Sequence, residues 1–228
     1  MKLFKSLELL LVAAAAAQAV AADSIQSKSV CSKVDSSSVL YNFDRDEKAT
    51  SHSNDETDVD QMVLANVRDQ LRKKIGSDFM SSVHFSHVRG VDFDSKGRLS
   101  LDNLRRIDVY DFTFEVRIGV GGAYKYAFAI GTEKTGKFLR DVEIPNIASS
   151  PDKAIIQPCS DAVTVARNAK VLTENKQIFV KLRFDRVADI FVWDVYAYRS
   201  GPALHSDHVW VNANTLAVQK IYDQSEAL

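Results

Sequence analysis

The sequence predicts an α+β protein of two tandem modules, each a helix packed on an antiparallel sheet of three or four strands. Two segments repeat apolar residues at three- and four-residue spacing, which is typical of one-sided helices. After each segment the spacing changes to two, which is typical of half-buried antiparallel strands. The order of helix and then strands occurs twice, and 228 residues suffice for two domains of about 100 residues.

The first helix is expected over residues 59–75. Its apolar stripe consists of Leu64, Val67, Leu71 and Ile75. Asp58 can cap the helix, with Gln61 three residues later to return the hydrogen bond, and Gly76 can end it because glycine tolerates a left-handed conformation. Residues 54–60 are acidic but lack the glycine and closing glutamate of a helix-loop-helix calcium site. We therefore interpret them as the helix start.

Three strands are expected in the first module, at residues 112–118, 124–130 and 136–144. Their core-facing residues are Phe112, Phe114, Val116 and Ile118, then Tyr124, Tyr126, Phe128 and Ile130, then Phe138, Val142 and Ile144. Gly121 and Gly122 join the first two strands. A phosphate-binding loop would lead into a helix, so we predict a hairpin turn here.

The second module repeats this order. Its helix stripe consists of Ala162, Val165, Ala166, Ala169 and Leu172. Strands are expected at residues 178–184 and 190–201, and the segment 208–223 supplies the last two. Asn212 and Asn214 lie between these last strands, and asparagine side chains bond nearby backbone in turns. We therefore interpret them as a hairpin corner rather than a ligand site.

The two halves align at a nearly constant offset. Phe112 and Glu115 match Phe191 and Asp194 at an offset of 79, and the segment TEKTGKF matches NANTLAV at an offset of 80. The helices match at an offset near 99, which leaves about 20 extra residues in the first half. These are expected to form a hairpin or flap around residues 91–109. The pattern predicts a tandem duplication.

One helix followed by three or four antiparallel strands resembles the cystatin-like fold. The last segment, VWVNANTLAVQKIY, also resembles the end of a PepSY domain, a small extracytoplasmic module that closes with two strands around an Asp/Asn-x-x-Thr-Gly turn. Asn212, Asn214 and Thr215 carry this resemblance, whereas Leu216 stands where that family favours glycine. In the first half, the segment IGTEKTGKFLRDV contains the Thr-Gly pair itself.

The resemblance covers residues 160–223 and, more loosely, 59–144. It implies an exported, non-catalytic module, and inhibition of secreted peptidases is a proposed role of some relatives. The tandem arrangement is also similar, in architecture only, to beta-lactamase inhibitor proteins.

The N-terminus has the pattern of a secretory signal peptide. Lys2 and Lys5 precede an apolar run, and small residues follow at 19–22, where we expect cleavage. A membrane anchor is the alternative, but a spanning helix needs about 20 apolar residues. The expected regions are a signal peptide (1–22), a polar tail (23–57) with a short strand at 39–43, and modules at 58–146 and 147–228.

Charge and cysteine content restrict the partners and the compartment. Without Lys2, Lys5 and Glu8, the chain has 27 basic and 29 acidic residues, which argues against nucleic acid as the main partner. Cys31 and Cys159 remain, and two thiols in an exported protein favour a disulfide. The alternatives are two free thiols, with Cys159 buried, or a reactive Cys159 near a helix start.

No catalytic or metal motif is evident, so we expect no enzyme activity, no metal and no cofactor. His84 and His87 would point to opposite faces of a strand. His205 and His208 are expected with Asp207 in or beside a hairpin loop, where they can converge but are more simply explained as exposed polar residues. No serine has a Gly-x-Ser-x-Gly context.

The carboxylates Glu115 and Asp194 lie at equivalent positions of the two halves. Two such carboxylates can do glycosidase chemistry when they face one cleft. We interpret them instead as residues of the solvated faces of two strands.

A sheet face of the second module is the predicted binding site. Asp194, Tyr196 and Tyr198 share one strand face, with Arg199 nearby, and Tyr and Arg are favoured at interface hot spots. We therefore expect a secreted or periplasmic protein that binds a protein partner through this face or through hairpin loops. The alternatives are a small-ligand or lipid carrier with an apolar sheet cavity and an uncharacterised hydrolase.

Overall fold

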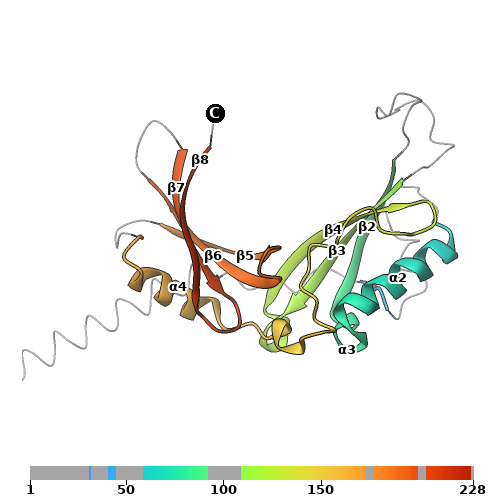
Figure 1. The fold of residues 1–228 in the computed structure, drawn as a ribbon, viewed down its shortest axis with the longest axis horizontal. Coiled ribbons are helices and arrows are strands. Elements are labelled where there is room, and N and C mark those ends of the chain that lie inside the picture. The colour runs from blue at the N-terminus through green and yellow to red at the C-terminus, as the bar shows by residue number, and fades with distance from the viewer. Residues whose placement is uncertain are drawn as a thin grey trace, which may run out of the picture.

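The computed structural model has two antiparallel sheets and few helices, which makes the chain a mixed α+β protein (Figure 1). The described residues are 31, 41–44, 59–91, 109–172, 177–199 and 204–226. The predicted signal peptide, most of the polar tail and residues 92–108 of the predicted hairpin or flap lie outside this set. No helix in the described part of the chain has the length and apolar character needed to cross a bilayer.

The first sheet follows chain order, β1-β2-β3-β4. Its strands are β1 (Tyr41–Asn42), β2 (Val83–Val91), β3 (Val109–Ile118) and β4 (Tyr124–Glu133). The predicted hairpin between β3 and β4 is confirmed, because a short 3-10 turn at Val120–Gly122 joins them. The predicted short strand at 39–43 is present as β1, which has only two residues.

The second sheet has the order β5-β6-β7-β8. Its strands are β5 (Ile178–Asp185), β6 (Ile190–Tyr198), β7 (Leu204–Asn212) and β8 (Val218–Glu226). The hairpin corner between β7 and β8 is as predicted. The Asn212 side chain accepts hydrogen bonds from the backbone N–H groups of Asn214 (2.8 Å) and Thr215 (3.0 Å).

The helices are shorter than predicted. They are α2 (Gln61–Ile75), α3 (Ser77–Met80) and α4 (Cys159–Asn168), with a 3-10 turn at Pro151–Ala154. Asp60 rather than Asp58 caps α2, because its carboxylate accepts from the N–H of Met62 at 2.8 Å. The second stripe was expected to reach Leu172, but α4 ends at Asn168 because Lys170 adopts a left-handed conformation with φ 58°.

The strand predicted at residues 136–144 does not form. Phe138 makes an isolated bridge to Thr132, and the chain then leaves the sheet. Two carbonyl groups of this segment accept hydrogen bonds from side chains instead. The Lys74 amine donates to the Val142 carbonyl (2.9 Å), and the Tyr126 hydroxyl donates to the Glu143 carbonyl (2.6 Å). Apolar residues of this segment are therefore buried beside the sheet rather than within it.

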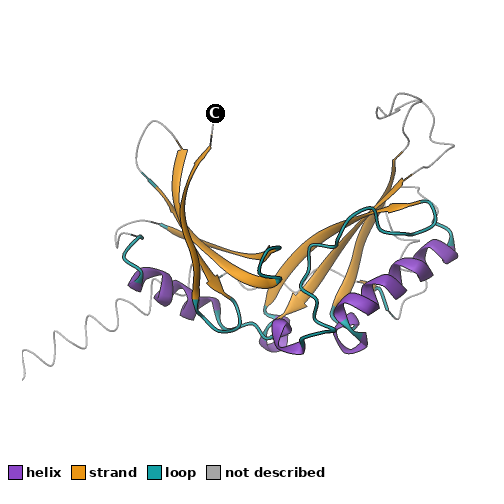
Figure 2. Cartoon of the chain, viewed as in Figure 1, coloured by secondary structure: helices purple, strands orange, loops and turns teal. Residues whose placement is uncertain are grey.

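The two sheets have their buried faces on the same side of the molecule. Tyr124 and Tyr126, on the core face of β4, contact Trp193 and Phe191 of β6 edge to face, with ring centroids 4.8 and 5.1 Å apart. Apolar residues of both sheets, α2 and α4 belong to one buried cluster. In Figure 2 the helices lie along the lower side of the sheets, so both sheets have their open faces on the other side.

The predicted disulfide is present, and the two alternatives for these cysteines are wrong. Cys31 is bonded to Cys159, the first residue of α4, with Cα atoms 6.0 Å apart. The bond closes a separation of 128 positions, which contributes about 4–5 kcal/mol in the chain-entropy account. It connects the N-terminal segment to the second half, and such bonds persist in oxidising compartments.

Gly136 is expected to be essential for stability. It has φ +82°, and a Cβ atom there would lie 2.6 Å from the Val63 carbonyl oxygen of α2. We predict that Gly136→Ala lowers the free energy of unfolding by at least about 2 kcal/mol in denaturant titrations. Gly121→Ala is the control, since Gly121 also has positive φ but has nothing within 4 Å, and it should cost about 1 kcal/mol. Equal losses would contradict the proposed clash.

Tyr126 should make the stability of the protein fall at alkaline pH. Burial, and then the charge of Glu143, raise the pKa of Tyr126, so the folded state holds the phenol proton more tightly than the unfolded state. Its contribution is complete below the unfolded pKa of about 10 and is lost as pH rises above it. We predict that Tyr126→Phe costs about 1 kcal/mol at pH 7 and that the deficit shrinks between pH 9 and 11. A constant deficit over this range would exclude the linkage.

Candidate functional site

The open face of the second sheet carries most of its exposed aromatic side chains. Residues that are paired across neighbouring strands point to the same side of a sheet, so the strand register shows which side chains share this face. We call this surface the aromatic face, and its rings are Phe179, Tyr196, Tyr198, His208, Trp210 and Tyr222. Two of the predicted site residues, Tyr196 and Tyr198, lie on it.

Four of these rings form a stack that crosses all four strands. Phe179, Tyr196, His208 and Tyr222 are opposed in register on β5, β6, β7 and β8. Successive ring centroids are 5.4, 4.9 and 4.7 Å apart, with interplanar angles of 22°, 12° and 12°. The two inner rings, Tyr196 and His208, therefore have a neighbour against both faces. Tyr196 is half-buried and His208 is buried, so neither ring offers a free face to solvent.

The ends of the stack are covered as well. Trp210 meets Tyr222 edge to face at 5.7 Å, and the amine of Lys220 lies 4.7 Å from the centre of the Tyr222 ring. Tyr198 meets Phe179 edge to face at 5.5 Å. Burial, and then the charge of Asp194, raise the pKa of Tyr222, so its phenol stays protonated.

Asp194 is the electrostatic centre of the aromatic face. It is fully buried, and its two oxygens accept hydrogen bonds from the Nδ1–H of His208 (2.7 Å) and from the Nε–H of Arg183 (2.6 Å). In the neutral ring the His208 Nε2 then accepts from the Ser206 hydroxyl at 2.8 Å. This chain of bonds fixes the plane of the His208 ring between Tyr196 and Tyr222.

The order Ser206–His208–Asp194 has the connectivity of a nucleophile, a base and an orienting acid. Its surroundings differ from those of a hydrolase site. Ser206 and His208 are only 4% and 3% exposed. The backbone of β7 is paired with β6 on one side and β8 on the other, so its N–H groups are not arranged as an oxyanion hole. The arrangement favours a positioning role for these side chains.

Arg199 does not join the aromatic face. Its guanidinium donates to both carboxylate oxygens of Asp207 (Nε at 3.0 Å from each) and pairs with Asp223 at 3.2 Å. Asp207 alternates with Ser206 and His208 along β7, so it points to the opposite side of the sheet. Of the four predicted site residues, the structure therefore brings together Asp194, Tyr196 and Tyr198.

The placement of the histidines differs from the prediction in two ways. His205, Asp207 and His208 lie within β7 rather than in a loop, and strand alternation separates the two histidines onto opposite faces. His84 and His87 share a face instead of opposing each other, because a register shift between Phe85 and His87 adds one residue to β2. Within the described residues, no three His, Cys, Asp or Glu side chains form a possible metal site.

The open face of the first sheet is charged rather than aromatic. Glu115 is only 4% exposed and forms ion pairs with Lys125 and with Arg117 (3.6 Å). His84 is its cross-strand neighbour on β2. Burial and the charge of Arg117 lower the pKa of His84, and the charge of Glu115 opposes this shift. Glu115 and Asp194 therefore do not share a cleft but lie on separate sheets.

One hollow of about 430 Å³ lies away from both open faces. It is lined by the corner between α2 and α3 and by the connector around residues 147–154. None of its lining residues belongs to a strand. The apolar sheet cavity that the carrier alternative requires thus gains no support from this hollow.

Comparisons with protein families, curated proteins and solved structures give no match to this chain.

Six members of the site were not predicted as binding residues: Phe179, Arg183, Ser206, His208, Trp210 and Tyr222. All but Ser206 lie at alternating positions of predicted strands, so their faces were predictable, whereas Ser206 lies before the predicted start of its strand. Their neighbours across the sheet depend on register, which no motif in the sequence specifies. The sequence also did not indicate which side of the second sheet the helices leave uncovered.

Asp194 should be the residue whose replacement most disturbs the aromatic face. Asp194→Asn keeps the shape but removes the charge that pairs with Arg183 and His208, so we predict a loss of about 2 kcal/mol in the free energy of unfolding. Near-ultraviolet circular dichroism should weaken at the same time. Ser206→Ala is the control and should cost about 1 kcal/mol, since it removes a single hydroxyl hydrogen bond. If Asp194→Asn cost no more than Ser206→Ala, the electrostatic role would be refuted.

Proposed function

We propose that the chain is an exported, non-catalytic binding protein that recognises a partner protein through the aromatic face. The observation that carries this proposal is the four-ring stack on a sheet face that no described helix covers. Tyr198 remains 42% exposed beside it. Tyr and Trp are enriched at protein interfaces because they supply a large contact area at a low entropic cost.

The ring geometry favours a protein over a sugar as the partner. A sugar ring packs on a free aromatic face, whereas the faces of Tyr196 and His208 are already occupied by their neighbours. The stack offers ring edges and phenol hydroxyls to solvent. These groups suit the mixed polar and apolar surface of a protein partner.

The charge on the aromatic face favours an acidic partner. Lys181 and Lys220 are exposed on this face and have no carboxylate partner among the described residues. The enclosed carboxylate, Asp194, is already paired with Arg183 and His208. Complementary charge accelerates encounter and selects partners, so the partner surface should carry Asp or Glu side chains opposite these lysines.

We further propose that the two halves are duplicated helix-plus-sheet modules of the PepSY-like or cystatin-like kind. Gly136 and Leu216, which are 80 positions apart, both have positive φ (82° and 60°) in the turn that follows β4 or β7. Glu115 and Asp194, which are 79 positions apart, are both buried carboxylates paired with a basic side chain. Such recurrence of unusual features at one offset supports duplication. An exported location fits the disulfide and the predicted signal peptide.

Binding should depend on Tyr198. We predict that Tyr198→Ala weakens binding of the partner at least about thirtyfold, because a tyrosine hot spot at an interface contributes about 2 kcal/mol or more. The chain would be immobilised, partners captured from the secreted or envelope fraction, and the affinity of the purified partner measured by biolayer interferometry. Lys181→Glu should slow association and make it less dependent on salt.

Met62→Ala provides the matched control. Met62 is 63% exposed on α2, on the helix side of the molecule. The proposal requires that this variant bind normally while Tyr198→Ala does not. A partner that binds Tyr198→Ala and Tyr196→Ala as tightly as the native chain, with both variants folded, would show that the aromatic face is not the interface.

A further inference from the structure

The corner hollow, the 430 Å³ space between the α2–α3 corner and the connector, has two firmly held walls. The connector is attached to α2 because the N–H of Ala148 donates to the Lys74 carbonyl at 3.0 Å. Gly76 separates the two helices with φ 80°, and Ala148 packs close against it. A space of this size lies within the range of small-molecule sites.

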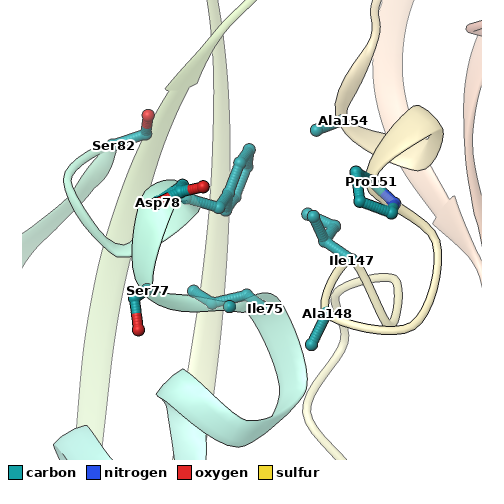
Figure 3. A pocket seen from close by; sticks show the side chains of 10 residues that line it. Ile75, Ser77, Asp78, Ser82, Ile147, Ala148, Pro151 and Ala154 are labelled. Atoms are coloured by element: carbon teal, nitrogen blue, oxygen red, sulfur yellow. The ribbon is translucent and has the colours of Figure 1, made fainter.

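The lining of the corner hollow is mainly apolar. Ile75 on the helix side and Ile147 on the connector side (Figure 3) are almost completely buried, and Phe79, Pro151 and Ala154 add further apolar surface. Three polar side chains, those of Ser77, Asp78 and Ser82, belong to the helix side. Figure 3 shows Asp78 on this wall, with its carboxylate directed toward the space between the two walls.

Asp78 gives the corner hollow its charge. Asp78 is exposed, and within the described part of the chain its carboxylate has no ion-pair or hydrogen-bond partner. The two nearest lysines along the lining segments are engaged elsewhere: the Lys74 amine donates to the Val142 carbonyl, and the Lys153 amine pairs with Asp189. The negative charge is therefore available to a ligand.

We propose that the corner hollow is a binding site for a small organic cation with an apolar body, such as an aryl or alkyl ammonium compound. The apolar part would occupy the space between Phe79, Ile147 and Pro151, and the ammonium group would pair with Asp78. This site is separate from the aromatic face, so the proposal does not depend on the proposed function.

The test compares two probes of nearly equal shape on the full disulfide-bonded chain. 2-Naphthylmethylamine is cationic at neutral pH, and 2-naphthylmethanol is neutral. Titrations followed by NMR shift changes should give saturable binding of the amine, about threefold tighter than that of the alcohol, which is the size of effect an exposed ion pair supports. Asp78→Asn should make the two probes bind equally. Asp141→Asn, which removes an exposed carboxylate of the connector side outside the lining, should leave the preference intact.

A second variant tests the location. Ala154→Trp fills the corner hollow from the connector and should abolish binding of both probes, while the native circular dichroism spectrum checks that the variant is folded. Should Ala154→Trp unfold the chain, Ala148→Trp tests the same wall. The proposal is overturned if neither probe saturates, if the amine has no advantage over the alcohol, or if a folded variant with a filled hollow binds as well as the native chain.

Discussion

The contact between the buried faces of the two sheets determines the rest of the structure. Each sheet has one apolar face that must be covered, and Tyr124 and Tyr126 of the first sheet pack against Trp193 and Phe191 of the second. This contact merges the two cores into one cluster. It also leaves both open faces on the same side, one charged around Glu115 and the other aromatic.

Local patterns were sufficient to predict most elements of the fold. The alternation in β3, β4, β5 and β6 and the glycine and asparagine turns are properties of a few adjacent residues, and they appear in the structure where expected. Errors arose where a distant contact decides the outcome. Residues 136–144 alternate like a strand, but the side chains of Lys74 and Tyr126 satisfy two of their carbonyl groups, so no further strand partner is needed.

The candidate site was predictable only in part, for the same reason. Tyr196 and Tyr198 follow from alternation along one strand. The hydrogen-bonded chain from Arg183 through Asp194 and His208 to Ser206 joins three strands, and its existence depends on their mutual register. Proximity in sequence did not predict the position of Arg199. It directly follows Tyr198, but its guanidinium is bound by Asp207 on the other side of the sheet. The bulge in β2 likewise reversed the expected faces of two histidines.

The positions of the two tryptophans confine the tryptophan fluorescence of the molecule to its second half. The chain contains only Trp193 and Trp210, and both belong to the second sheet. Trp193 lies in the shared core and donates its indole N–H to the Gln157 carbonyl, whereas Trp210 lies on the aromatic face beside Tyr222. Fluorescence excited at the red edge of the absorption band therefore comes from one tryptophan on each side of a single sheet. The first half of the chain contains no tryptophan, so its unfolding changes this fluorescence only through the contact of Tyr124 with Trp193.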